Sequence, residues 1–144
     1  MIDHVDQQYL HGEGDENGDC ERAAIASLFR LPIEDVPHFC SRANEHRHAE
    51  LLEEWLQPFG LTRLSFRYDR DIARLLRGVA HLLSGPSPRF PNEYHCVVAH
   101  SGEIIHDPHP DRTGLAPPTD EMPWLAEVFI ARHPAEIVAL RRER

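Results

Sequence analysis

Residues 17–29 read NGDCERAAIASLF, and within a few positions a polar, glycine-containing loop gives way to an apolar run. The apolar side chains recur at the spacing of one helix face (Ala24, Ile25, Leu28 and Phe29). This pattern predicts a helix that begins at Cys20, with Asp19 as its N-cap, and ends before Pro32. A thiol on the first turn of a helix meets unsatisfied backbone N–H groups and the positive end of the helix dipole, which favour a thiolate. Cys20 is therefore the first candidate for a nucleophile.

The length and composition indicate one globular domain. The chain has 144 residues, enough to bury a core without disulfides or a metal, so we expect a single domain over residues 1–144. Its net charge of −9, from 24 acidic and 15 basic residues, disfavours nucleic acid or an anionic membrane as a partner. The three cysteines are odd in number and have no framework spacing, which favours a reducing compartment.

The chain shows no targeting or membrane signal. Its N-terminus lacks the basic and apolar regions of a signal peptide, and no apolar stretch approaches the roughly 20 residues of a membrane span. We therefore expect a cytoplasmic protein that has no membrane partner and needs no cofactor. Nothing in the sequence indicates an oligomeric state.

Helical patterns dominate the first half of the chain and strand patterns the second. An irregular, acidic lead-in over residues 1–18 precedes the first helix, and Asn44 is the expected cap of a second helix that runs to about Pro58. Further segments are a weak strand at 61–67, a helix at 69–77, and strands at 79–83, 94–99, 103–106, 127–131 and 137–140. Helices first and strands afterwards predict an α+β fold, in which N-terminal helices pack on a C-terminal antiparallel sheet.

Two proline-rich loops bracket the segment from His95 to Asp107. Eight of the 12 prolines lie in residues 85–93 and 108–126. The second loop is long enough to be an ordered functional loop, although a surface loop stiffened by proline would have the same composition.

The turn between residues 94–99 and 103–106 decides whether His95 and Asp107 can meet. A two-residue loop at Ser101 and Gly102 would place Asp107 opposite Cys96, facing away from His95. A three-residue loop over 100–102, with Gly102 in the left-handed conformation, would place His95 directly across from Asp107. We expect the second register, in which Cys96 and His106 share the opposite face and Cys96 is excluded as the nucleophile.

Cys20, His95 and Asp107 are the residue types of a thiol-hydrolase triad. In such a site the histidine takes the thiol proton, while the acid fixes the imidazole tautomer and stabilises its charged form. Because Asp19 and Glu21 flank Cys20 and oppose a thiolate, the protonated His95 would supply much of the stabilisation. Each residue also has an ordinary structural interpretation: a buried thiol, a hydrogen-bonded core histidine, and an acid that starts a turn.

Three motifs taken together resemble the papain-like cysteine peptidase fold. They are GDCxxAxxASL at residues 18–28, HxVV at 95–98 and HDP at 106–108. The resemblance is to the small bacterial and phage branch that is related to the bacteriocin-processing peptidase domains of ABC exporters. Residues 31–39 and 84–89 also look like members of that branch, and the resemblance spans roughly residues 14–115.

The resemblance implies a papain-like hydrolase, a peptidase or amidase with Cys20 as nucleophile, His95 as base and Asp107 as third member. Its substrate would be a peptide, a protein or another compound with an amide bond, and the same residues would serve acyl transfer. Such enzymes use a glutamine shortly before the cysteine in the oxyanion hole. Here the residue six positions earlier is Gly14, so the candidate donors are Gln7, Gln8 and Asn17.

Two other functions fit the sequence. One is a catalytically silent papain-like module that binds a protein or peptide, such as a phage accessory factor. The other is a metal-binding domain built on a cluster of histidines and an acid (His95, His100, His106, Asp107 and His109). Zinc needs three or four ligands that converge, and in the expected register His95 and His106 face opposite ways. We therefore expect no metal site in this cluster.

Overall fold

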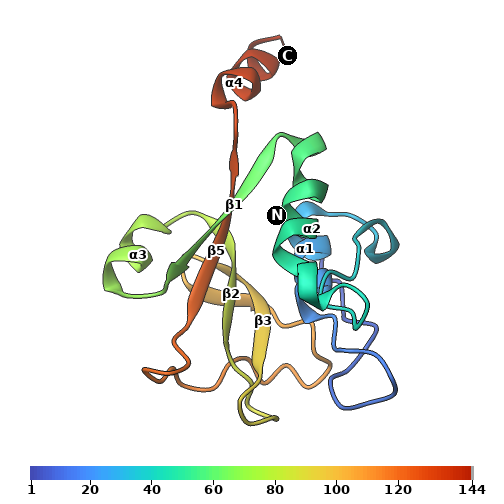
Figure 1. Cartoon of the computed structure of the whole chain (residues 1–144). Coiled ribbons are helices and arrows are strands. Elements are labelled where there is room, and N and C mark those ends of the chain that lie inside the picture. Colours follow the sequence, from blue (N-terminus) through green and yellow to red (C-terminus); the bar gives the residue numbers. More distant parts are fainter. Residues whose placement is uncertain (144) are drawn as a thin grey trace.

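The computed structural model describes residues 1–143 as an α+β fold (Figure 1). This confirms the fold class that the order of sequence patterns predicts. The helices are α1 (Cys20–Phe29), α2 (His48–Leu56), α3 (Arg70–Leu75) and α4 (Pro134–Arg142). The strands are β1 (Leu61–Arg67), β2 (Ala80–Pro86), β3 (Tyr94–His100), β4 (Glu103–His106) and β5 (Leu125–Ala131). Short 3-10 helices cover Ile33–Asp35, Glu45–Arg47 and Gln57–Phe59.

The five strands form one antiparallel sheet in the order β1-β5-β2-β3-β4. Strand β5, which comes late in the chain, lies between β1 and β2 and pairs with both. Helices α1 and α2 lie together on one side in Figure 1, and α3 lies on the other. None of the helices within residues 1–143 has the length and apolar character needed to cross a membrane.

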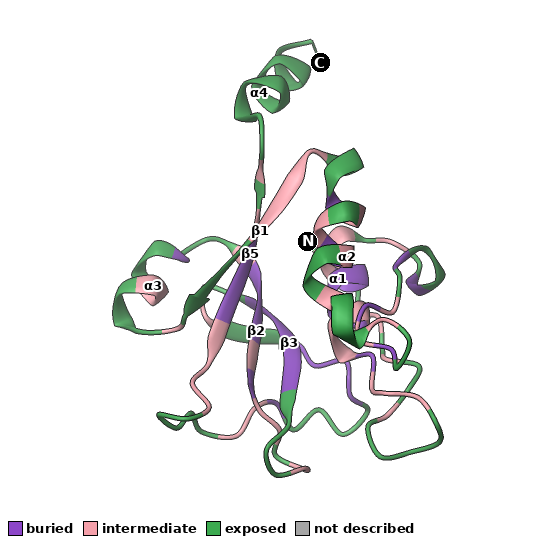
Figure 2. Ribbon diagram, viewed as in Figure 1, coloured by how far each residue is buried: buried purple, intermediate pink, exposed green. Residues whose placement is uncertain are grey.

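Helix α1 packs on β3 through small side chains. Its residues Ala23, Ala24 and Ala26 are completely buried, and they belong to one core cluster with Leu82 of β2 and Val98 of β3. A second cluster contains Leu83, Val97 and Ala126, the neighbouring residues on β2, β3 and β5. Because side chains alternate along a strand, β2 and β3 contribute to a core on each face, and Figure 2 shows both as largely buried.

The β3–β4 hairpin differs from the predicted register. His100 pairs with Glu103, so the loop has two residues, Ser101 and Gly102, both with positive φ (54° and 81°) as in a type I′ turn. The expected three-residue loop is therefore wrong.

A bulge in the hairpin nevertheless places Asp107 on the face of the sheet that was predicted for it, the face of His95. Ala99 pairs with Ile104 but Val98 pairs with His106, so β4 contains one extra residue at this point. Continuing the ladder by one residue places Asp107 across from Val97, on the face of β3 that His95 shares. His95 and Asp107 are thus diagonal neighbours instead of direct partners.

Two other local predictions are wrong. Residues 137–140, expected as a strand, lie in α4, where Pro134 occupies the first turn and the helix is exposed along its length. Asn44 does not cap α2. It precedes the 3-10 helix Glu45–Arg47, and its side-chain amide donates to the carbonyl oxygen of His38 at 3.1 Å.

Gly85 on β2 leaves no room for a side chain. An added Cβ would lie 2.4 Å from Trp124 Cδ1, and the Trp124 indole is fixed by a 2.9 Å hydrogen bond from Nε1 to the carbonyl oxygen of Ala116. We expect Gly85→Ala to lower the free energy of unfolding by about 1–3 kcal/mol through overpacking, measured by urea denaturation. In a Trp124→Leu background the same change should cost less, because the clash is relieved. Equal costs in both backgrounds would contradict this explanation.

Candidate active site

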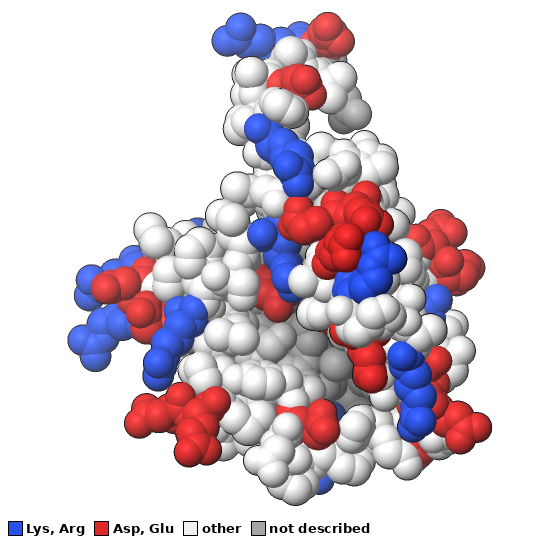
Figure 3. Space-filling view, in the orientation of Figure 1, with Lys and Arg blue, Asp and Glu red and all other residues white. Residues whose placement is uncertain are grey.

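Cys20 and His95 line one cleft of about 550 Å³ between the start of α1 and the start of β3. The thiol of Cys20 is half-buried. Figure 3 shows this face hollowed between the helices and the sheet, with acidic side chains along its rim. The cleft is lined from the N-terminal loop, α1, the segment before α2, and the strands β2 and β3, and includes Gln7, Asn17, Glu21, Cys40, His48 and His109.

Two hydrogen bonds between Tyr9 and Asp19 join the ends of the loop that leads into α1. The backbone N–H of Asp19 donates to the carbonyl oxygen of Tyr9 at 3.2 Å, and the N–H of Tyr9 donates to Asp19 Oδ1 at 2.8 Å. Asp19 is only 1% exposed, and its side chain makes no N-cap hydrogen bond to α1. Asp19 therefore occupies the predicted N-cap position, but its carboxylate does not cap the helix: it holds the preceding loop and pairs with Arg22 at 3.4 Å.

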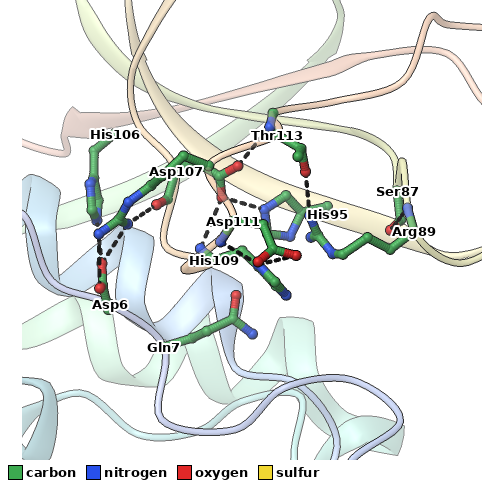
Figure 4. Close-up of polar contacts among 12 residues, drawn as sticks. Asp6, Gln7, Ser87, Arg89, His95, His106, Asp107, His109, Asp111 and Thr113 are labelled. Atoms are coloured by element: carbon green, nitrogen blue, oxygen red, sulfur yellow. Dashed lines mark hydrogen bonds and ion pairs between the residues drawn. The ribbon is translucent and has the colours of Figure 1, made fainter.

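His95 and Asp107 form a buried pair. His95 Nε2 lies 2.7 Å from Asp107 Oδ1, and the two residues are 4% and 5% exposed. The carboxylate also accepts backbone hydrogen bonds from His109 at 2.9 Å and from Gly114 at 2.7 Å, and the network is drawn in Figure 4. With Nε2 donating to Asp107, the His95 ring has Nδ1 left for a second partner.

The electrostatics of this pair favour an imidazolium next to a carboxylate. Burial lowers the pKa of His95, but the hydrogen bond with Asp107 and the influence of the nearby Cys20 thiol outweigh it and raise the pKa to about 9. Burial likewise raises the pKa of Asp107, but the bonds from His95 and from two backbone N–H groups outweigh it and lower the pKa to about 2. His95 thus binds the acid directly and shares the cleft with the Cys20 thiol.

The other two thiols have surroundings that suppress a thiolate. Burial, together with the nearby Glu21, raises the pKa of Cys40 strongly. Cys96 is in the core beneath α1, where burial raises its pKa well above the ordinary value. Its place in this core fits the prediction that Cys96 is not the nucleophile.

The three candidate oxyanion donors differ in what their amides already bind. The Asn17 amide uses both hydrogens, on the Cys40 carbonyl and on Glu45 Oε2, each at 2.8 Å. The Gln8 carbonyl accepts from Arg22 at 3.1 Å, and Gln8 is not among the residues that line the cleft. Gln7 lines the cleft, and its side-chain amide donates one hydrogen bond to the Tyr9 carbonyl at 2.7 Å. Of the three, Gln7 alone both lines the cleft and has an amide hydrogen without a partner among residues 1–143.

His109 is a cleft residue that sequence reasoning considered only as a metal ligand. Its ring lies edge-on to that of His95, with centroids 6.2 Å apart. The backbone N–H of Asp111 donates to His109 Nδ1 at 3.0 Å, so the neutral ring carries its hydrogen on Nε2. Burial and the nearby Arg89 lower the pKa of His109, which favours this neutral form. Its position two residues after Asp107 is the one sequence signal that would have indicated it.

The histidines grouped in the sequence do not converge on a metal site. His106 Nε2 donates to the Val5 carbonyl at 2.7 Å, and His100 is exposed at the hairpin end. Within residues 1–143, the one set of at least three metal-type ligands in mutual proximity is Glu21, Cys40 and His48.

Comparisons of the chain with protein-family models, with curated proteins and with solved structures found no match.

Proposed function

We propose that this protein is a papain-like cysteine hydrolase that acts on an amide or related acyl bond. The observation that carries the proposal is that Cys20, on the first turn of α1, shares a cleft with His95 and helps to raise its pKa, and that His95 in turn binds the buried Asp107. A nucleophile, a base and a group that orients the base are the three parts of a thiol-hydrolase site.

Each group has a definite role in the proposed reaction. The Cys20 proton resides on His95 Nδ1, in keeping with the raised pKa of His95, and the thiolate sulfur attacks the acyl carbon of the substrate. The Cys20 backbone N–H and the free amide hydrogen of Gln7 stabilise the resulting oxyanion. The imidazolium then protonates the leaving amine, which gives a thioester. Finally His95 deprotonates a water that hydrolyses this thioester, and the acid product and the thiol are released.

The alternative of a silent binding module requires a Cys20 that does not react. Such a protein would use the same cleft to hold a peptide without cleaving it. Cys20 in this structure is half-buried and lines an open cleft, which supports the hydrolase. Thiol reactivity separates the two functions without knowledge of the substrate.

Cys20 should be the fastest thiol to react with a low concentration of iodoacetamide at neutral pH. We expect it to be alkylated at least about tenfold faster than Cys40 or Cys96, because His95 supports its thiolate. Trypsin places the three cysteines in separate peptides, 1–22, 31–42 and 90–112, so mass spectrometry gives each rate. His95→Ala should abolish the difference, whereas His100→Ala, at the exposed end of the same strand, should not. Equal and slow labelling of all three thiols would favour the silent module.

The oxyanion assignment can be tested on neighbouring glutamines. Acylation of Cys20 by p-nitrophenyl acetate should release one equivalent of nitrophenolate in a burst. Gln7→Ala should slow this burst by about 100- to 1,000-fold, the usual cost of an oxyanion donor. Gln8→Ala should leave the rate within about twofold, because its carbonyl binds Arg22 outside the cleft. Equal rates in the two variants would contradict the role of Gln7.

The protonation of His95 should depend on Asp107. By NMR of the imidazole nitrogens, His95 should titrate near pH 9, and Asp107→Asn should lower the midpoint to or below the ordinary value of 6.5, because burial then dominates. Asp111→Asn, an exposed acid in the same loop, should have little effect. Since the folded-state pKa is raised, the stability that His95 contributes is complete below its ordinary pKa and is lost as the pH rises through 9. A wild-type midpoint at or below the ordinary value would contradict the pairing.

A further inference from the structure

We propose that Glu21, Cys40 and His48 form a binding site for one divalent cation that accepts a thiolate, with Zn²⁺ as the best-fitting ion. The ligand atoms of the three side chains all lie within 4.8 Å of one another. This site is distinct from the histidine cluster of the sequence and does not depend on the proposed hydrolase activity.

Three separate parts of the chain bring the ligands together. Glu21 is on the first turn of α1, Cys40 lies between two 3-10 helices, and His48 is the first residue of α2. All three are partly buried and line the same cleft. Because two of them sit on helix ends that are packed in the core, the fold holds the set in place before any ion binds.

The distances suit a tetrahedral ion. Bonds of about 2.3 Å to sulfur and about 2.0–2.2 Å to nitrogen and oxygen place ligand atoms of a tetrahedral zinc site about 3.4–3.6 Å apart. His48 Nε2 and Glu21 Oε2 already lie 3.5 Å apart. Closing the remaining distances requires a movement of Cys40 Sγ of the order of 1 Å, within reach of a change in its side-chain torsion.

Glu21 supplies an independent indication of a ligand. Its second oxygen, Oε1, is buried and has no hydrogen-bond partner among residues 1–143. A buried, unpaired carboxylate oxygen is costly, and a cation bound to this carboxylate would offset that cost. A second carboxylate close by, Glu127, is only 8% exposed and pairs with Arg63 at 3.2 Å. The Arg63 guanidinium is therefore already paired with Glu127.

The donor set selects among ions. A thiolate, an imidazole and a carboxylate suit Zn²⁺ and Co²⁺, whereas Mg²⁺ and Ca²⁺ prefer oxygen ligands alone. On binding, the Cys40 S–H bond breaks, its electron pair forms the metal–sulfur bond, and the proton passes to solvent without any redox change. Three protein ligands leave a fourth position for water or a small ligand in the cleft.

Cobalt provides a direct spectroscopic test on the reduced full-length protein. Titration with Co²⁺ should produce a sulfur-to-cobalt charge-transfer absorption and strong tetrahedral d–d bands that saturate at one equivalent and disappear when Zn²⁺ is added. Cys40→Ser should abolish the charge-transfer absorption, and His48→Gln should weaken binding at least about tenfold. The matched controls are Cys20→Ser, a thiol of the same cleft, and His46→Gln, an exposed histidine two residues away; both should bind like the wild type.

The proposal fails if the wild type gives no charge-transfer absorption, or if that absorption survives Cys40→Ser or is lost in Cys20→Ser. Circular dichroism of each metal-free variant shows whether it is folded. A test on the wild type avoids variants altogether: Zn²⁺ should protect His48, but not His46, from diethyl pyrocarbonate. Trypsin separates the two histidines into peptides 43–47 and 48–63, and equal modification of both in the presence of Zn²⁺ would overturn the site.

Discussion

The contact between α1 and β3 is the interaction on which the candidate site depends. The helix meets the sheet through Ala23, Ala24 and Ala26, each fully buried, and such small side chains allow the helix backbone to approach the strand closely. Cys20 begins this helix and His95 is the second residue of this strand. The packing of two rigid elements therefore fixes the distance between the two groups, instead of leaving it to loop conformation.

A second constraint ties the N-terminal segment to the loop that carries Asp107. Arg112 donates to the backbone carbonyl of Asp107 and also pairs with the Asp6 carboxylate, at 2.6 and 2.9 Å. Next to it, the Gln7 N–H donates to the carbonyl of Pro108 at 3.1 Å. The acid that binds His95 and the residue whose amide is proposed for the oxyanion hole are thus held by one network. This connection explains how a glutamine 13 positions before the cysteine in the sequence can line the same cleft.

Local patterns predicted the helices and most strands, because apolar spacing records which face is buried. The same patterns failed where a different constraint decided the structure. A bulge near Val98, and not the loop length, sets the face of Asp107, and no composition rule marks a bulge of this kind. Residues 137–140 are apolar but follow Pro134, which starts a helix. The sequence does not indicate the set of Glu21, Cys40 and His48, since its members are distant in sequence and only the packing of the helices joins them.

The charges around Cys20 also differ from what sequence proximity indicates. Asp19 and Glu21 flank the thiol in the chain and were expected to oppose a thiolate. In the folded protein, however, Asp19 is turned into the preceding loop and pairs with Arg22, while Glu21 lies 3.5 Å from His48. Each acid has a basic partner of its own, so neither charge acts on the sulfur unopposed. Cys20 shares its cleft with the imidazole of His95, whose positive form is held by a carboxylate with three hydrogen bonds of its own. The fold therefore gives the two adjacent acids partners of their own and leaves the buried His95–Asp107 pair as the group that we propose to act on the thiol.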